Sequence, residues 1–342
     1  MVKVIPRLSE FSAANVPIEE LDAFYTIANV AAPEDRPYVW SNSMTTLDGF
    51  MHYNSTSSAS SIQHSSVSTP KSELEHGSVE SDIALKKHPQ AGPYSLADYR
   101  LLNAGWVYAD AVLSSGPCLR TDPLLRHVPI FKDMQQHRTK VLNKPFAPLH
   151  IAVTSKASTL SFSTHSFFNS PDLPVLVVTH ELDVQPSIDA FIASKSTGGN
   201  PDTCLWSPAL HEPNTPGTVR FLSFPPSPTP STSSASSPAS VDLSQLLHFL
   251  KHELRINSLE IDAGGSMIRN MIDLKLIDEL RWTQVGHVIG GTDALGNPRP
   301  SLFNSPSADS YTANTSPVFR MAGIRAIGEH FLFLRTVLEY RH

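Results

Sequence analysis

The chain has 342 residues, a formal net charge of −6 and a sequence pI of about 6.2. With 40% hydrophobic residues, the chain can bury the core of one large domain or two small ones. Only 17% of its residues are charged and 28 are proline, so part of the chain is predicted to be linker. The mildly acidic balance, without a run of five or six Lys or Arg residues, argues against a nucleic-acid or membrane-surface partner.

The N-terminus has none of the features of a secretory signal. It carries charges at Lys3, Arg7 and Glu10 and has no apolar run of seven residues. No window of the chain approaches the eighteen apolar residues of a membrane span. The two cysteines, Cys118 and Cys204, are too few for a disulfide framework and lack the paired spacing of a zinc site. We therefore expect a soluble cytoplasmic protein without a metal site.

We expect an N-terminal extension over residues 1–35 and one domain over residues 36–342. Two segments of this domain, at about 54–80 and 225–240, are dominated by Ser, Thr and Pro. Such segments bury too little apolar surface to offset the entropy of ordering them. We expect both to be disordered insertions that leave the surface of the domain and return close by.

Strand-like and helix-like segments alternate along the rest of the chain. Short apolar or alternating runs predict strands at residues 38–44, 111–113, 149–153, 175–178, 218–224, 258–261, 278–285 and around 331–334. Apolar residues at helical spacing predict helices at residues 96–108, 243–254 and 267–276. Continuous apolar runs are typical of strands covered on both faces, so the pattern predicts an α/β fold with a mostly parallel sheet.

The segment I-D-A-G-G-S at residues 261–266 is the first candidate site. A strand ends there, and a pair of glycines opens a helix. Close backbone approach at Gly264 and Gly265, with the N–H groups of Ser266, Met267 and Ile268, would suit a dinucleotide pyrophosphate. The alternative is an ordinary tight turn with Ser266 as the helix N-cap. The spacing is not G-x-G-x-x-G, which disfavours a Rossmann domain.

The polar loop at residues 114–123 is the second candidate, because it follows the strand at 111–113. Ligands bind α/β sheets at the carboxyl ends of strands. Asp122, which precedes a proline, is equally compatible with turn chemistry. Cys118 has no evident base beside it in the sequence and is not favoured as a nucleophile.

The third candidate is N-S-M-T-T-L-D-G at residues 42–49, where another strand ends in hydroxyl groups and a carboxylate. Asp48 either binds a polar substrate or caps the turn. Histidines are scattered, and His127, His137, His248 and His252 are expected to be surface residues rather than metal ligands. There is no G-x-S-x-G elbow of a serine hydrolase.

Taken in order, these stretches resemble the pyrimidine reductase family of riboflavin biosynthesis, the C-terminal domain of bifunctional deaminase-reductases. The family carries an N-M-x-x-S-L-D-G type motif, then A-D-A-V-L, then G-x-x-T-x-x-x-D-x-P, and finally E-G-G before a helix. The matching positions here are residues 42–49, 109–113, 118–122 and 263–265, followed by L-K-L-I-D-E-L at 274–280, G-G at 290–291 and L-F-L-R at 332–335.

The resemblance implies a dihydrofolate-reductase-like three-layer α/β sandwich that reduces the ribose of a phosphorylated pyrimidine substrate to ribityl with NADPH. A homodimer is also implied. Thr46 and Asp48 would face the substrate or the nicotinamide. The cofactor-binding residues implied by the same motifs are Cys118, Asp122, Gly264, Gly265, Ser266, Met267 and Ile268.

Several positions depart from the family pattern. The threonine of the second motif is Cys118, its first glycine is Ser115, and the glutamate of E-G-G is Ala263. Trp106 stands where an arginine is frequent, and an indole cannot replace a bidentate guanidinium contact to phosphate. The alternatives are therefore a reductase of the same fold with another substrate, or a non-catalytic ligand-binding dimer.

Overall fold

The computed structural model describes residues 30–51, 92–196, 205–207, 215–224, 241–292, 296, 298–299, 301–302, 316–327 and 331–340. The insertions predicted at 54–80 and 225–240 lie outside the described residues, as do Cys204 and residues 1–29 of the predicted extension. The division of the chain into an extension and one domain stays a prediction.

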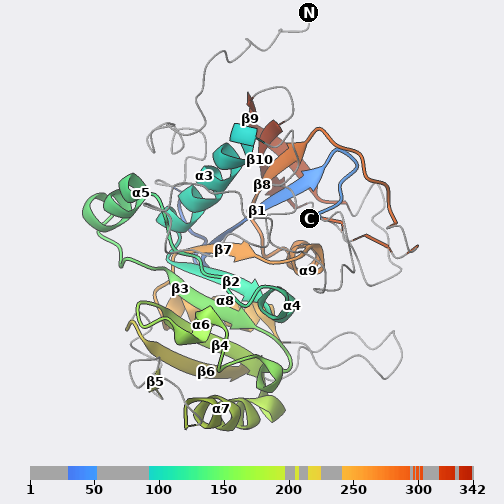
Figure 1. Cartoon of the computed structure of the whole chain (residues 1–342). Helices are drawn as coiled ribbons and strands as arrows, with labels where there is room; N and C mark the ends of the chain where they lie inside the picture. Colours follow the sequence, from blue (N-terminus) through green and yellow to red (C-terminus); the bar gives the residue numbers. More distant parts are fainter. Residues whose placement is uncertain are drawn as a thin grey trace, which may run out of the picture.

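Ten strands form one sheet in the order β5-β6-β4-β3-β2-β7-β1-β8-β10-β9 (Figure 1). Neighbouring strands are parallel, except that β10 is antiparallel to both β8 and β9. The strands are β1 Tyr38–Thr46, β2 Ala111–Ser115, β3 Leu149–Val153, β4 Pro174–His180, β5 Leu205–Trp206, β6 Thr218–Phe224, β7 Ser258–Asp262, β8 Glu279–Val285, β9 Val318–Ile327 and β10 Phe331–Glu339.

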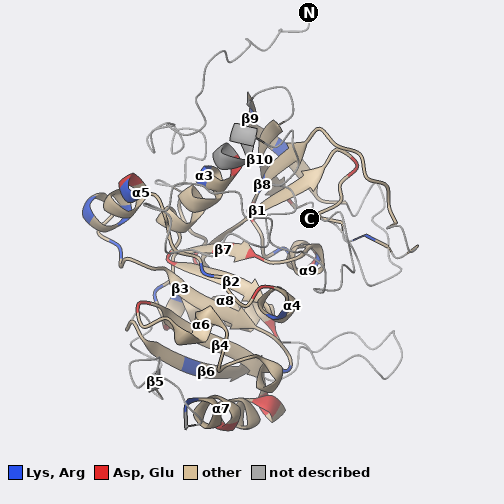
Figure 2. Cartoon of the chain, viewed as in Figure 1, with Lys and Arg blue, Asp and Glu red and all other residues tan. Residues whose placement is uncertain are grey.

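Helices cover both faces of this sheet. They are α3 Gly92–Tyr108, α4 Gly116–Thr121, α5 Lys132–Gln136, α6 Ser166–Asn169, α7 Glu181–Ser196, α8 Leu243–His252 and α9 Gly265–Asp273, with shorter helical turns η3 His137–Val141 and η4 Ala157–Thr159. Figure 2 shows Lys and Arg spread over several described elements, among them α5, α4 and β6. Among the described residues, no helix is long and apolar enough to cross a membrane.

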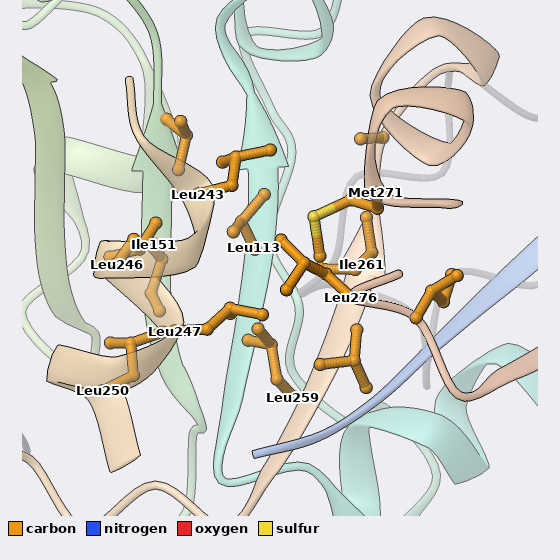
Figure 3. Packing of buried hydrophobic residues seen from close by; sticks show 14 of the residues in the cluster. Leu113, Ile151, Leu243, Leu246, Leu247, Leu250, Leu259, Ile261, Met271 and Leu276 are labelled. Carbon is orange, nitrogen blue, oxygen red and sulfur yellow. The ribbon is translucent and has the colours of Figure 1, made fainter. Parts of the chain in front are cut away.

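One face of the sheet is covered by α8 and α9 and is almost entirely aliphatic. Asp242 caps α8 by accepting from the N–H groups of Ser244 and Gln245 at 3.0 Å. The leucines of α8 recur three or four residues apart, so they share one buried stripe. They pack on buried strand residues, as Figure 3 shows: Leu243, Leu246, Leu247 and Leu250 on Leu113, Ile151, Leu259 and Ile261.

The opposite face is covered by α3, α5, α6 and α7 and buries many polar groups. Trp40 and Phe333 pack under α3, and Phe191 of α7 packs with Phe221. Glu260 and Glu279, in contrast, are charged residues of strands on this face with no exposed surface. Burying a carboxyl group is costly unless it is paired or protonated, so this face is where function is expected to lie.

The fold confirms the predicted α/β class with a mostly parallel sheet. Strands β3 and β6 begin and end at the predicted residues, and the other predicted strands differ by a few residues. The helix predicted at 267–276 is α9, which begins two residues earlier, at Gly265. Helix α7, with Pro186 inside it, and the edge strand β9 have no counterpart among the predicted elements.

Candidate functional site

The candidate site lies at the carboxyl ends of β2, β7 and β1, which are neighbours in the sheet although they are far apart in the chain. Ser114 of β2 pairs with Asp262 of β7, so the turns that follow these two strands start side by side. The amide of Gly264 donates to the sulfur of Cys118 across that gap. The first and second candidate segments therefore meet, as expected for a ligand site in a parallel sheet.

The turn between β7 and α9 is open on one side and closed on the other. A Cβ at Gly264 would meet no atom within 4 Å, whereas a Cβ at Gly265 would lie 1.9 Å from the carbonyl oxygen of Ser301. Gly264 has a φ of −68°, which any residue adopts. Neither the backbone conformation nor the packing therefore requires a glycine at position 264. The lack of a side chain there leaves space for a ligand.

The N-terminus of α9 differs in two details from the turn predicted at residues 261–266. Gly264, and not Ser266, is the N-cap of α9. The N–H groups of Met267 and Ile268 both donate to the Gly264 carbonyl, at 2.9 and 3.3 Å. The helix therefore uses two of the three amides that were expected to be free. The amides of Gly265 and Ser266 precede the first hydrogen bonds of the helix, so these two are the better candidates to bind an anion.

Cys118 sits in the first turn of α4, directly after β2. Its sulfur accepts a hydrogen bond from the Ser115 hydroxyl at 3.2 Å. Burial, reinforced by the charge of Asp262, raises the pKa of the Cys118 thiol despite the hydrogen bond from Ser115. A thiol of raised pKa is a poor nucleophile, and the residue links the two turns rather than reacting.

Asp122 ends α4 and shapes the next turn. Its N–H donates to the Cys118 carbonyl at 3.0 Å, and its Oδ1 accepts from the N–H of Leu124 at 3.0 Å. This is the turn role that the sequence left open. The other carboxylate oxygen, Oδ2, is buried and has no hydrogen-bond partner among the described residues. The placement of Asp122 beside a cofactor stays a prediction.

Thr46 and Asp48 join the turn after β1 to the loop after β8. The Thr46 hydroxyl donates to Asp48 Oδ1 at 2.6 Å, and Asp48 Oδ2 accepts from the amides of Ile289 and Gly290 at 3.0 and 2.7 Å. The slight desolvation of Asp48 is outweighed by these hydrogen bonds, which lower the pKa of its carboxyl. Both oxygens are engaged within the protein, and contact with a substrate stays a prediction.

His127 is not the surface residue that the sequence led us to expect. Its side chain has no exposed surface, and its Nε2 lies 2.7 Å from the Ser114 hydroxyl oxygen. Burial, with the neighbouring His150 and His165, lowers the pKa of His127 well below its ordinary value. No local pattern marks this residue, because its burial comes from segments distant in the chain.

Glu260 is a second residue that the sequence analysis missed. It occupies the middle of β7 with no exposed surface, and its Oε1 accepts from the Asn42 amide at 2.6 Å. Burial, reinforced by the charge of Asp262, raises the pKa of Glu260 to about 8. A glutamate in the middle of the predicted strand S-L-E-I was the available signal. It marks a carboxyl group that holds a proton near neutral pH.

Trp106 is a buried residue of α3. Only 4% of its surface is exposed, and its ring packs edge-on against Tyr99 and His127 with centroids 6.4 and 5.5 Å away. Pro117 lies on the surface. Within the described ranges, no group of three or more His, Cys, Asp and Glu residues is arranged to hold a metal ion.

A mostly parallel sheet with helices on both faces defines an α/β protein of the dihydrofolate-reductase-like class. The chain belongs to the RibD C-terminal domain family, whose sequence model matches residues 37–333. The family resemblance inferred from the motifs is thereby confirmed. No curated protein sequence matches the chain significantly.

Solved structures agree on the fold. A pyrimidine reductase-like protein from Corynebacterium diphtheriae superposes with a TM-score of 0.54 at 18% identity, over 95% of this chain and 100% of that one. Two forms of RibD from Acinetobacter baumannii give TM-scores of 0.51 and 0.50 at 14% and 15% identity, over 90% of this chain. This chain spans 59% of the length of that RibD.

Proposed function

We propose that this protein is an NADPH-dependent reductase that converts the ribosyl side chain of a phosphorylated aminopyrimidine into ribityl, as in riboflavin biosynthesis. Its RibD C-terminal family and its likeness to a pyrimidine reductase-like structure support a reductase. The observation that carries the proposal is the open Gly264 at the start of α9, where an added Cβ would meet no atom within 4 Å.

The residues at this turn fit a cofactor phosphate. Gly264 and Gly265 would allow the phosphate to approach the backbone, and the amides of Gly265 and Ser266 would donate to it. NADPH, when bound, supplies the hydride. The turn that contains Cys118 would border the cofactor on the β2 side, and Asp122 would follow it. Thr46 and Asp48 would hold the opposite turn in place beside the substrate.

A valine at Gly264 is expected to weaken NADPH binding about tenfold or more, because its side chain would occupy the space left for the phosphate. The midpoint of thermal unfolding should change little, since a Cβ there meets no atom within 4 Å. Fluorescence titration with NADPH, repeated with NADH, measures the affinity and the cofactor preference.

Two further variants serve as controls in this titration. Ser266→Ala should bind like the wild type, because the contact is made by the backbone amide. Gly265→Val is unsuitable as a binding test, since its Cβ would lie 1.9 Å from the Ser301 oxygen and disturb packing. Unchanged NADPH affinity in a folded Gly264→Val protein would contradict the cofactor site.

A reductase of the same fold with another substrate is the second candidate. It is favoured by Trp106, a buried indole at a position where the family often has a guanidinium for phosphate. Tight NADPH binding without turnover of the ribosylaminopyrimidine would support it. Absence of NADPH binding up to millimolar concentration would instead support a non-catalytic ligand-binding protein.

The remaining expectations belong to the same proposal. A homodimer is expected from the family resemblance, and sedimentation at micromolar concentration would test it. A cytoplasmic location is expected from the small number of cysteines and the nature of the reaction.

A further inference from the structure

Two histidines lie side by side on the exposed face of α8. His248 and His252 are four residues apart, which places them on one face of the helix, and both are exposed. The centroids of their rings are 4.2 Å apart, with an angle of 36° between the ring planes. Leu247 and Leu250 of the same helix are buried in the core, so the histidine pair faces solvent. Both are surface residues, as the sequence predicts, but their rings also lie against each other.

Neither ring bonds to another of the described residues, so the nitrogen atoms of both are available to a ligand. Lys251, which lies between the two histidines in the chain, donates from Nζ to Asn257 Oδ1 at 2.9 Å instead. A neutral imidazole carries one N–H group and one nitrogen with a lone pair. The exposed face of α8 therefore presents two nitrogen lone pairs close together.

We propose that His248 and His252 together bind one divalent transition-metal ion of the class of Zn²⁺, through one ring nitrogen each, with water in the remaining positions. A zinc–nitrogen bond is about 2.0–2.1 Å long, so one ion reaches two rings only when they lie as close as these do. Two histidines four residues apart on a helix are also the spacing with which helical zinc sites hold the metal. This site goes beyond the proposed reductase function and does not depend on it.

The helix holds the pair in place before an ion binds. Asp242 caps the N-terminus of α8, and the buried leucine stripe packs the helix onto the sheet, so little conformational freedom is lost on binding. His252 is the last residue of α8, and the C-terminal end of a helix carries a partial negative charge that favours a cation. Glu253, exposed and next in the chain, adds a carboxylate close by.

The two nitrogen donors decide the kind of ion. Imidazole suits Zn²⁺, Ni²⁺ and Cu²⁺, whereas Mg²⁺ and Ca²⁺ prefer oxygen ligands. In the part of the chain that the structure describes, no third His, Cys, Asp or Glu residue joins the pair. A site with two protein ligands keeps open positions, unlike the closed four-ligand sites of structural zinc. We therefore expect an exchangeable ion, and tighter binding of Cu²⁺ than of Zn²⁺.

The pair lies at the other end of the strands from the candidate functional site. α8 ends at His252, and the next strand, β7, begins at Ser258. The C-terminal end of α8 is therefore close to the amino end of β7, whereas the candidate site lies at the carboxyl ends of β2, β7 and β1. Metal binding should leave the Kd for NADPH unchanged, so the metal site and the proposed function can fail separately.

Isothermal titration calorimetry of the full-length protein with ZnCl₂ tests the site. Because the chain has 15 histidines, matched variants are needed to locate the ion. His248→Gln and His252→Gln should each weaken Zn²⁺ binding about tenfold or more, because the second imidazole no longer completes the chelate. Both side chains are exposed, so the midpoint of thermal unfolding without metal should change little. MgCl₂ should show no binding to the pair.

The double variant His252→Gln, Glu253→His is the matched control. It keeps the number of histidines but moves the second imidazole about 100° round the helix, away from His248. We expect this variant to bind Zn²⁺ as weakly as His252→Gln. With one equivalent of Cu²⁺, pulsed electron paramagnetic resonance should detect two imidazoles on the ion in the wild type and at most one in each variant.

Three results would overturn the proposal: equal Zn²⁺ affinity in the wild type and both single variants, full affinity in the double variant, or no Zn²⁺ binding by the wild type at millimolar concentration. Protein that binds Zn²⁺ through the pair but never binds NADPH would contradict the proposed function and leave the metal site established.

Discussion

Replacing Glu279 by alanine is expected to lower the free energy of unfolding by about 3–5 kcal/mol, the usual cost of removing one partner from a buried ion pair. Glu279 has no exposed surface and accepts from Arg281 Nε at 2.7 Å, from Arg335 Nε and Nη2 at 2.9 Å, and from the Tyr38 hydroxyl at 2.9 Å. Without the carboxylate, the buried guanidinium of Arg281 and the partly buried guanidinium of Arg335 both lose this shared negative partner. Urea denaturation measures the loss.

An exposed ion pair of the same sheet provides the matched control. Arg320 and Glu339 lie 2.7 Å apart with side chains more than half exposed, so Glu339→Ala should cost less than about 1 kcal/mol. Burial alone would raise the pKa of Glu279, but Arg281 and Arg335 outweigh it and lower that pKa. Its contribution to stability is therefore present above its unfolded pKa and lost as the pH falls. A loss below 1 kcal/mol in Glu279→Ala would contradict the assigned role.

Glu260 is expected to make the protein less stable as the pH rises from 5 to 8. Its pKa is raised from 4.5 to about 8 in the folded state, first by burial and then by Asp262. Over this range the folded protein keeps a proton that the unfolded chain releases, so the stabilisation is complete below the unfolded pKa and is lost as the pH approaches the folded one. At 1.36 kcal/mol per pKa unit, the loss is about 3 kcal/mol.

Glu260→Gln isolates this effect, because it keeps the shape and the acceptor for Asn42 but has no proton to release. Between pH 5 and pH 8, the free energy of unfolding should fall by about 3 kcal/mol less in this variant than in the wild type. Urea denaturation at the two pH values measures the difference. Buried histidines such as His150, whose pKa burial lowers to about 3, titrate in both proteins and cancel in the comparison. The exposed Glu253→Gln serves as the control. Equal pH dependence in Glu260→Gln and wild type would refute the buried proton.

The sequence was informative wherever local pattern and burial coincide. The apolar run L-H-I-A-V at β3 is covered on both faces, and its bounds were predicted correctly. The leucine stripe of α8 was likewise sufficient. Strand β9 was missed because it is an edge strand with exposed residues such as Met321 and Ile324, so burial imposes no apolar alternation on it.

In the candidate site, too, the sequence identified the residues that a local pattern marks and missed the others. The strand-end segments around Asp48, Cys118 and Gly264 were found because turns and glycines leave local signatures. These segments meet at one edge of the sheet, where β2 pairs with β7. That meeting depends on the order of the strands in the sheet and not on the sequence of any one segment. His127 was assigned wrongly because nothing within a few residues of it shows that Ser114 and Asp262 will surround it.

By itself, the sequence determined the α/β class, the position of most strands and the family, since these depend on periodic burial and on short motifs with fixed spacing. Only the tertiary structure decided that Gly264 is open and Gly265 closed, since the difference lies in the carbonyl of Ser301. It also decided that Glu260 holds a proton and that His127 faces Asp262. Those properties come from desolvation and from contacts between segments distant in the chain, which no local pattern encodes.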